Sequence, residues 1–139
     1  MIILDTNVLS ALMLKEPDAD VVSWLDAMPP ESIWTSSITV FEIRFGLEIM
    51  NDGSKKNRLQ DAFESVLREE FSGRVLDFDK PAAEAAALLF ADKRKRGQTI
   101  EVRDAMICGI ARARHASVAT RNVKHFETTD IIIINPWSK

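Results

Sequence analysis

Short, continuously apolar runs alternate along the chain with longer stretches in which apolar residues recur at helical spacing. The apolar runs predict five strands, at 2–4, 32–35, 75–78, 117–119 and 131–134. The longer stretches predict six helices, at 8–14, 19–28, 37–50, 54–72, 80–96 and 103–115. Strands that are apolar on both sides are typical of a parallel sheet covered on both faces. The pattern therefore predicts a single domain, 1–139, with three α/β/α layers around a mainly parallel sheet.

The helix predicted at 37–50 carries an unexpected carboxylate, Glu42. At about 100° per residue, Ile38, Phe45 and Ile49 lie on the same side of this helix as Glu42. A lone carboxylate among apolar side chains is costly unless something compensates its charge. The nearby Arg44 points away, so the compensating group is either a basic residue distant in sequence or a bound cation.

Two other carboxylates are expected near the same edge of the sheet, because functional groups of parallel sheets collect beyond the carboxyl ends of the strands. Asp5 follows the first strand, and Asp104 begins the helix at 103–115. Helix capping alone would also explain both residues. The two histidines, His115 and His125, are expected at the surface rather than among metal ligands.

Three clustered carboxylates, Asp5, Glu42 and Asp104, would repel one another unless a cation joined them. Hard oxygen ligands without cysteine or histidine favour Mg²⁺ or Mn²⁺ over zinc. Such an ion activates water and neutralises charge on a phosphate, so this cluster predicts hydrolysis of phosphodiester bonds. On this interpretation the metal ion compensates Glu42, directly or through water.

The charge distribution supports a polyanionic partner more than the net charge of −3 does. Between positions 92 and 124 the chain has nine Lys or Arg residues against three Asp or Glu. The run at 93–96 also fits the solvated end of a helix, where the helix dipole favours positive charge. The basic residues expected to contact the phosphates of such a partner are Lys93, Arg94, Lys95, Arg96, Arg121 and Lys124.

The remaining composition predicts a cytoplasmic protein that has no membrane partner. The single cysteine, Cys108, allows no intramolecular disulfide, which favours a reducing compartment. The N-terminus shows no secretory signal pattern. The longest purely aliphatic run, 131–134, is far too short to cross a bilayer.

Four stretches together resemble the PIN-domain nucleases, and most closely their VapC-type toxins. They are LDTNVLSAL at 4–12, SSITVFEIRFGLE at 36–48, RDAMICGIA at 103–111 and ATRNVKHFE at 119–127. The closing INPW at 134–137 is similar to a FitB-like subgroup of these toxins. The stretches follow the family's order and spacing, so the resemblance covers nearly the whole chain.

The resemblance implies a Mg²⁺- or Mn²⁺-dependent endoribonuclease that cleaves transfer RNA or other structured RNA. It also implies the toxin of a type II toxin–antitoxin pair, a homodimer inhibited by a cognate antitoxin that binds operator DNA. Asp5, Glu42 and Asp104 match the family's metal-binding and catalytic positions. The matching polar positions around this acidic cluster are Thr6, Asn7, Thr120 and Asn122. Some members carry a fourth acid where this chain has Asn122, so one well-occupied metal site is expected.

The helix at 37–50 has a second apolar side, formed by Val40, Ile43, Leu47 and Met50. Together with the side around Glu42, this surface is wider than one sheet face covers. We therefore expect it to be buried in a dimer or under an antitoxin helix. Replacing Leu47 with a charged residue should then disrupt association.

An alternative interpretation is a PIN-like module with little turnover that assembles with an antitoxin-like partner on operator DNA; the intact acidic trio argues against it. Another phosphoryl-transfer enzyme on a similar sheet fits less well. Phosphoaspartate hydrolases need a second Asp two residues after Asp5, where this chain has Asn7. The chain also contains neither GxxxxGK[ST] nor GxGxxG, the glycine-rich nucleotide-binding motifs.

Overall fold

A parallel sheet with the strand order β3-β2-β1-β4-β5 lies at the centre of the molecule. The structure is a computed structural model that describes residues 1–127 and 129–138. Its strands are β1 (Ile2–Leu4), β2 (Ile33–Ser36), β3 (Val75–Leu76), β4 (Ser117–Ala119) and β5 (Ile133–Ile134). The predicted parallel sheet is confirmed.

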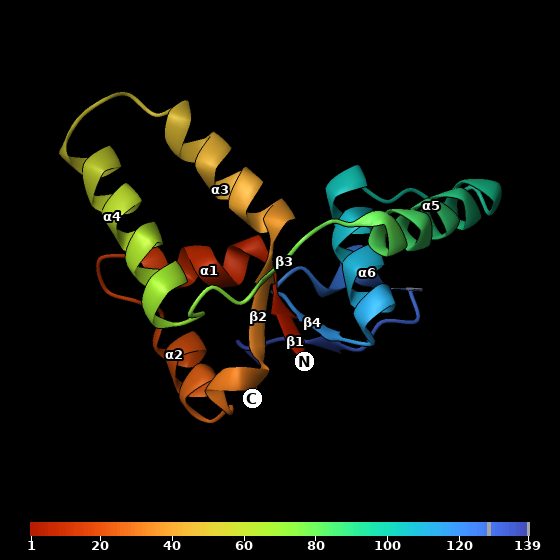
Figure 1. Ribbon diagram of the computed structural model, residues 1–139, viewed down its shortest axis with the longest axis horizontal. Coiled ribbons are helices and arrows are strands. Elements are labelled where there is room, and N and C mark those ends of the chain that lie inside the picture. The colour runs from red at the N-terminus through yellow and green to blue at the C-terminus, as the bar shows by residue number, and fades with distance from the viewer. Residues whose placement is uncertain (128, 139) are drawn as a thin grey trace.

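Helices cover both faces of this sheet, which confirms the predicted three layers (Figure 1). One face carries α1 (Thr6–Met13), α2 (Ala19–Asp26), α3 (Ser37–Glu48) and α4 (Ser54–Glu69), and the other carries α5 (Lys80–Lys95) and α6 (Val102–Arg114). Two short 3₁₀ turns complete the chain, η1 (Pro30–Ser32) and η2 (Val123–Phe126). None of the helices described is long and apolar enough to cross a membrane.

The strands supply two hydrophobic cores, because successive side chains of a strand point to opposite faces of the sheet. Leu4 and Ala119 pack into the core beneath α1–α4. Their neighbours Ile3 and Val118 pack into the core beneath α5 and α6. Continuously apolar strands are therefore needed, and this explains why the hydrophobic pattern predicted the architecture.

The element boundaries follow local capping groups. Ser36 caps the N-terminus of α3, since its Oγ accepts a hydrogen bond from the backbone N–H of Thr39 at 3.2 Å. α4 begins at Ser54, as predicted, and Gly53 precedes it in the N-cap position without a side-chain hydrogen bond. β3 is shorter than predicted because the backbone N–H of Phe78 donates to Ser37 Oγ, at 3.0 Å, instead of joining the sheet.

The orientation of α3 differs from the prediction. Ile43 and Leu47, expected at an interface between chains, are buried in the core of this chain together with Phe63 and Val66 of α4. As predicted, the sheet alone does not cover this apolar side of α3. The remaining part of that side packs against α4 of the same chain. The side of α3 near Glu42 is the exposed one.

Candidate active site

Asp5 lies directly after β1, where the carboxyl end of the strand places it at the edge of the sheet. One carboxylate oxygen, Oδ1, accepts the backbone N–H of Thr6 at 2.8 Å, so the predicted capping role is real. The other, Oδ2, accepts the hydroxyl of Thr120 at 2.8 Å and the amide of Asn7 at 3.3 Å. Asp5 is only 5% exposed, and this burial raises the pKa of its carboxyl, although the hydrogen bonds from Thr120 and Thr6 oppose the shift.

Asn7 and Thr120 connect the ends of two neighbouring strands, β1 and β4. Asn7 Nδ2 donates to Thr120 Oγ1 at 3.1 Å, and Asn7 Oδ1 accepts the backbone N–H of Arg121 at 3.1 Å. Thr120 Oγ1 also accepts the backbone N–H of Asn122 at 3.1 Å. These bonds hold Asp5 in one orientation and fix the loop that follows β4.

Glu42 is compensated by a residue distant in sequence. Its Oε2 accepts a hydrogen bond from Arg103 Nη1 at 3.1 Å, and its Oε1 accepts the hydroxyl of Thr6 at 3.0 Å. Its side chain is 20% exposed, so it lies at the rim of the site rather than among apolar groups. The ion pair that the sequence left open is therefore present, and no metal ion is required to explain the position of Glu42.

Asp104 lies in the first turn of α6, as predicted, with its Oδ2 3.1 Å from Nδ1 of His125. Burial raises the pKa of the Asp104 carboxyl, and repulsion from Asp5 raises it further. His125 was expected at the periphery. Its side chain is exposed at the surface, as expected, but it also belongs to the site, because η2 folds back over the start of α6.

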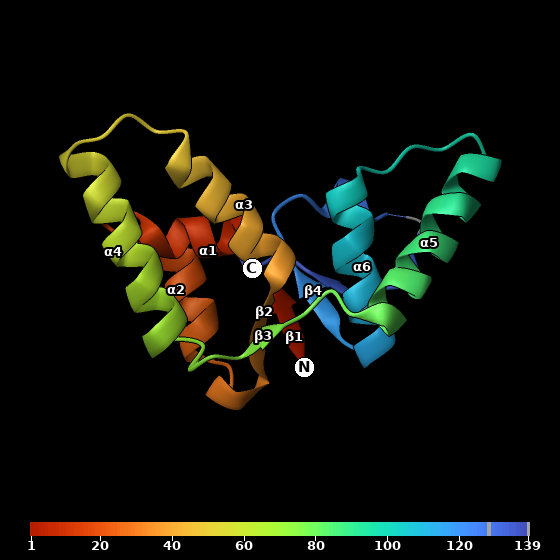
Figure 2. The same ribbon diagram turned by 45° about the horizontal axis from the view of Figure 1, so that its top comes forward.

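The three carboxylates line one open cavity of about 410 Å³, together with Asn122 and His125. Figure 2 shows the elements that bring them together, with α3 and α6 on either side of the ends of β1 and β4. Within residues 1–127 and 129–138, however, no three Asp, Glu, His or Cys side chains come close enough to hold one metal ion. The carboxylates therefore share a cavity without converging on a single point.

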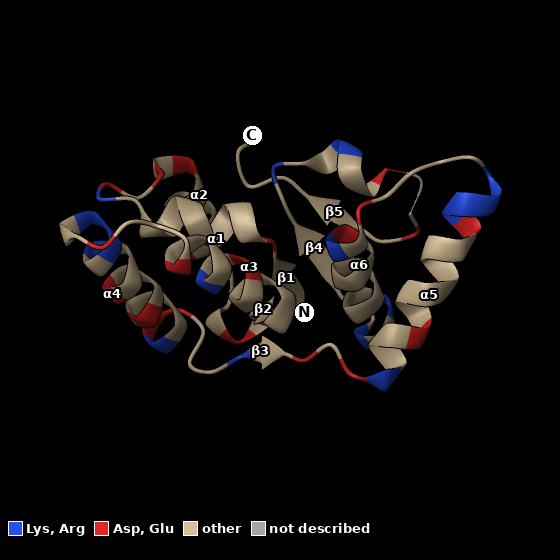
Figure 3. Cartoon of the chain, turned by 90° about the horizontal axis from the view of Figure 1, so that it is seen from above, with Lys and Arg blue, Asp and Glu red and all other residues tan. Residues whose placement is uncertain are grey.

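The basic residues divide into two kinds. Lys and Arg residues gather at the end of α5 (Figure 3), where Arg94, Lys95 and Arg96 are exposed. Lys93 is different, because it is 5% exposed and its Nζ donates to the backbone carbonyl of Glu127 at 3.0 Å. Its burial contradicts the expectation of a solvated side chain that contacts RNA.

Sequence reasoning missed four residues of this site. Arg103 pairs with Glu42, while Ser10, Glu101 and His125 line the cavity. Glu101 and Arg103 lie within three positions of Asp104, so their proximity was a usable clue. Nothing comparable in the local sequence pointed to Ser10 or His125.

An acidic cavity at the carboxyl edge of a parallel sheet is shared by many enzyme families, so the comparison with known proteins decides between them. Residues 2–131 match the PIN domain family. The chain belongs to the PIN domain family. This confirms the resemblance inferred from the four sequence stretches.

Relatives that match over nearly their full length show which PIN-domain proteins this chain resembles in sequence. The chain is 42% identical over 137 residues to plasmid stability protein StbB of Pseudomonas syringae pv. tomato, covering 99% of both chains. It is 42% identical over 137 residues to VapC ribonuclease Y4jK of Sinorhizobium fredii, covering 99% of this chain and 98% of the relative. Toxin FitB of Neisseria gonorrhoeae is 37% identical over 137 residues, with 99% of both chains covered.

Solved structures of FitAB and FitAcB show the same similarity in fold. The crystal structure of FitAcB from Neisseria gonorrhoeae matches with a TM-score of 0.89 and 37% identity, covering 100% of both chains. The structure of FitAB bound to an IR36 DNA fragment matches with a TM-score of 0.88 and 37% identity, covering 100% of this chain and 97% of the other. This PIN domain is thus FitB-like in sequence and in fold.

Proposed function

We propose that the chain is a Mg²⁺- or Mn²⁺-dependent endoribonuclease that acts as the toxin of a type II toxin–antitoxin pair. The observation that carries the proposal is the shared cavity, into which three separate elements bring Asp5, Glu42 and Asp104. The names of the similar proteins, a VapC ribonuclease and a toxin, support the same activity. We infer that transfer RNA or another structured RNA is the substrate.

Asp5 and Asp104 fit a divalent metal ion best. The carboxyls of both have raised pKa values, and that of Asp104 is raised partly by the charge of Asp5. A cation between them would stabilise both charged forms, and an all-oxygen donor set suits Mg²⁺ or Mn²⁺. When bound, the ion would supply an activated water and neutralise charge on the phosphate.

Polar residues around the acidic cavity hold the carboxylates in position. Asn7 and Thr120 fix the Asp5 carboxylate, and the Asn122 side chain faces the same cavity without adding charge. We propose that Glu42, held by Arg103 and Thr6, accepts a hydrogen bond from the attacking water. The ion pair with Arg103 supports a position of Glu42 beside the proposed metal site rather than among the closest ligands.

We propose that the substrate phosphates contact the exposed cations of the predicted set, which are Arg94, Lys95, Arg96, Arg121 and Lys124. Lys93 is left out because its ammonium is buried against the Glu127 carbonyl. Arg121 also stacks over the Trp137 ring, at 4.9 Å from its centroid. This contact orients the guanidinium without using its hydrogen-bond donors.

The exposed side of α3 is the surface that we propose for a second copy of the chain or for an antitoxin. Phe41, Phe45 and Ile49 are 60%, 54% and 69% exposed, and the two phenyl rings stack with centroids 6.1 Å apart. Adjacent exposed apolar side chains of this size are typical of a protein interface. The similar FitAB structure, which was solved with DNA, supports an antitoxin that also binds DNA.

Metal-dependent cleavage by the purified protein tests the proposed function. We expect cleavage of transfer RNA in Mg²⁺ or Mn²⁺, none in EDTA, and a loss of at least about 100-fold in Asp5→Asn and Asp104→Asn. Asp61→Asn, on the exposed surface of α4, is the matched control and should cleave like the parent chain.

The opposite result would favour the alternative of a PIN-like module with little turnover. Each of the three carboxylates already has a protein partner, which is what such a module would show. If the parent chain, Asp5→Asn and the EDTA control gave the same RNA products, the nuclease proposal would be contradicted. The remaining interpretation would be a module that assembles with an antitoxin on DNA.

A further inference from the structure

A second cavity, of about 490 Å³, opens directly beside the acidic cavity. It lies between the loop that joins α5 to α6 and the η2 turn. The two cavities share the side chains of Glu101, Asp104 and His125. A molecule in the second cavity would therefore extend to the edge of the candidate catalytic site.

The walls of this cavity combine charged and uncharged polar groups with one aliphatic side chain and one imidazole ring. Gln98 and Thr99 contribute an amide and a hydroxyl, and no hydrogen bond found among the described residues uses either side chain. Ile100 and the imidazole of His125 offer surfaces against which a planar ring can pack. Its volume lies within the about 300–1,000 Å³ typical of small-ligand sites.

A smaller cavity of about 180 Å³ continues away from the acidic site. It shares Gln98, Thr99 and Ile100 with the second cavity and adds Phe90 and Arg94. The end of α5 beyond it carries exposed cations (Figure 3). The acidic cavity adjoins the second cavity on the side of Glu101, Asp104 and His125. The path therefore runs from the candidate metal site to a surface that attracts phosphates.

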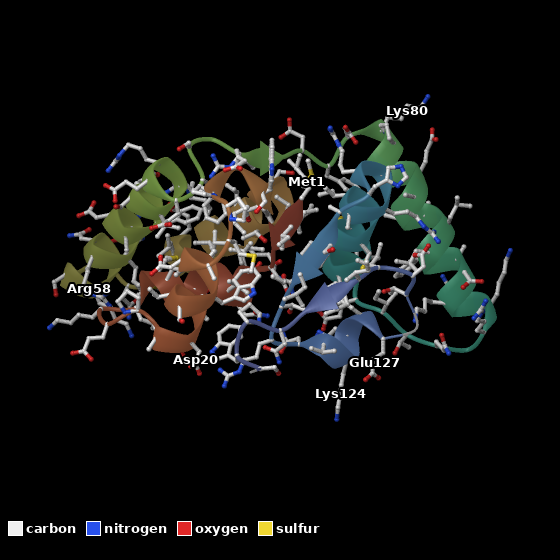
Figure 4. The ribbon with its side chains drawn as sticks, turned by 90° about the horizontal axis from the view of Figure 1, so that it is seen from below. Met1, Asp20, Arg58, Lys80, Lys124 and Glu127 are labelled. Carbon is white, nitrogen blue, oxygen red and sulfur yellow. The ribbon has the colours of Figure 1, made fainter. Side chains whose placement is uncertain are left out.

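A contact between its two walls holds the cavity in shape. The buried Lys93 links its two walls, because its Nζ extends from α5 to the backbone carbonyl of Glu127, which follows η2. Lys124 and Glu127 lie close together on this wall (Figure 4). Lys93 thus has a structural role that explains its burial.

We propose that this second cavity is a nucleotide subsite, which holds one unstacked base of the RNA next to the phosphate that is cleaved. Gln98 and Thr99 hydrogen-bond the edge of the base, and the neighbouring phosphate on the far side lies against Arg94. Single-stranded RNA is read in this way, by stacking and by hydrogen bonds to base edges. The inference rests on the proposed ribonuclease activity and makes the subsite a determinant of where the RNA is cut.

Cleavage of a pool of short single-stranded RNAs with randomised positions on both sides of the cut tests the subsite. Sequencing the products obtained in Mn²⁺ gives the base preference at each position. We expect the parent chain to prefer particular bases at one position beside the cut. Gln98→Ala and Thr99→Val should each reduce that preference about three- to tenfold, because each removes hydrogen bonds to the base. The preference at other positions should be unchanged.

The matched control is Gln60→Ala on α4, which lies on the opposite face of the sheet (Figure 1). It should keep both the activity and the base preference of the parent chain. Cleavage without any base preference, or an unchanged preference in both Gln98→Ala and Thr99→Val, would overturn the subsite alone. Cleavage of transfer RNA without any cleavage of the pool would also overturn the subsite alone. Absence of cleavage of both the pool and transfer RNA by the parent chain would overturn the ribonuclease proposal together with the subsite.

Discussion

At the scale of single residues, Asp104 lowers the stability of the folded protein at a position where we propose that it binds a metal ion. Its carboxylate is partly buried and repelled by Asp5, and both effects raise its pKa. A raised carboxyl pKa means that the folded protein holds its proton more tightly than the unfolded chain does. At neutral pH the charged form therefore destabilises the metal-free fold.

We predict that Asp104→Asn stabilises the protein while abolishing its activity. Removing the charge should raise the thermal unfolding midpoint at pH 7 in EDTA by about 2–5 °C. Differential scanning fluorimetry measures this shift, with Asp61→Asn as the control that should leave it unchanged. A lower midpoint in Asp104→Asn would contradict the proposed cost of the charge.

The same substitution has a defined pH dependence. The stability of the parent chain falls as the pH rises from the unfolded to the raised folded pKa of Asp104, because the folded state binds more protons in that window. Below both values the carboxyl is neutral in either state. The advantage of Asp104→Asn should therefore disappear toward pH 3 and be fully present at pH 7.

The pair of Glu42 and Arg103 gives a second prediction at this scale. Arg103→Gln removes a positive charge from the carboxylate, so the affinity for Mn²⁺ measured by calorimetry should rise about three- to tenfold. The gain in Mn²⁺ affinity should vanish in the Glu42→Gln background, so that Arg103→Gln combined with Glu42→Gln binds Mn²⁺ like Glu42→Gln alone. If the gain persists in the double variant, Glu42 does not contribute to cation binding.

At the scale of elements, the packing of α5 on α6 depends on one glycine. A Cβ at Gly109 would lie 2.4 Å from the backbone oxygen of Ala82 and 2.7 Å from the Cβ of Ala86. The two helices approach so closely that only hydrogen fits between them. Because Asp104 lies on α6, this packing also positions part of the candidate site.

Gly109→Ala should therefore destabilise the fold by about 1–3 kcal/mol through overpacking. Urea unfolding measures the change as a lower midpoint. The matched control is Gly46→Ala on α3, where a Cβ meets nothing within 4 Å. It should stabilise the helix by about 0.5–1 kcal/mol. Equal effects of the two substitutions would contradict the close approach of α5 and α6.

At the scale of the whole molecule, the exposed side of α3 is the surface that we propose for association with another chain. Phe45→Glu places a charge on the surface formed by Phe41, Phe45 and Ile49, so it should weaken self-association or antitoxin binding at least tenfold. Light scattering and titration with the antitoxin measure the two interactions. Leu88→Glu on α5, where the leucine is 68% exposed, is the control for an added surface charge.

An unchanged oligomeric state and antitoxin affinity in Phe45→Glu would reject this surface. The Leu47 substitution suggested by the sequence no longer tests association. Because Leu47 is buried between α3 and the helices beside it, a charge there would unfold the monomer.

The sequence by itself determined the order of the elements, the parallel sheet and the family. Strand and helix patterns are local, because each depends on the spacing of apolar residues over a few positions. The carboxyl ends of parallel strands lie at one edge of the sheet, so the sequence also indicated that Asp5, Glu42 and Asp104 share one end of the molecule. Their roles in metal binding and catalysis stay predictions.

Only the tertiary structure decided which groups meet at that edge. Arg103 reaches Glu42 across 61 positions of sequence, and His125 reaches Asp104 across 21. Whether Leu47 or Phe45 faces solvent depends on where α4 packs, which helical periodicity cannot specify. Periodicity divides a helix into sides, but the free energy of burying each side depends on elements that are distant in the sequence and adjacent only after folding.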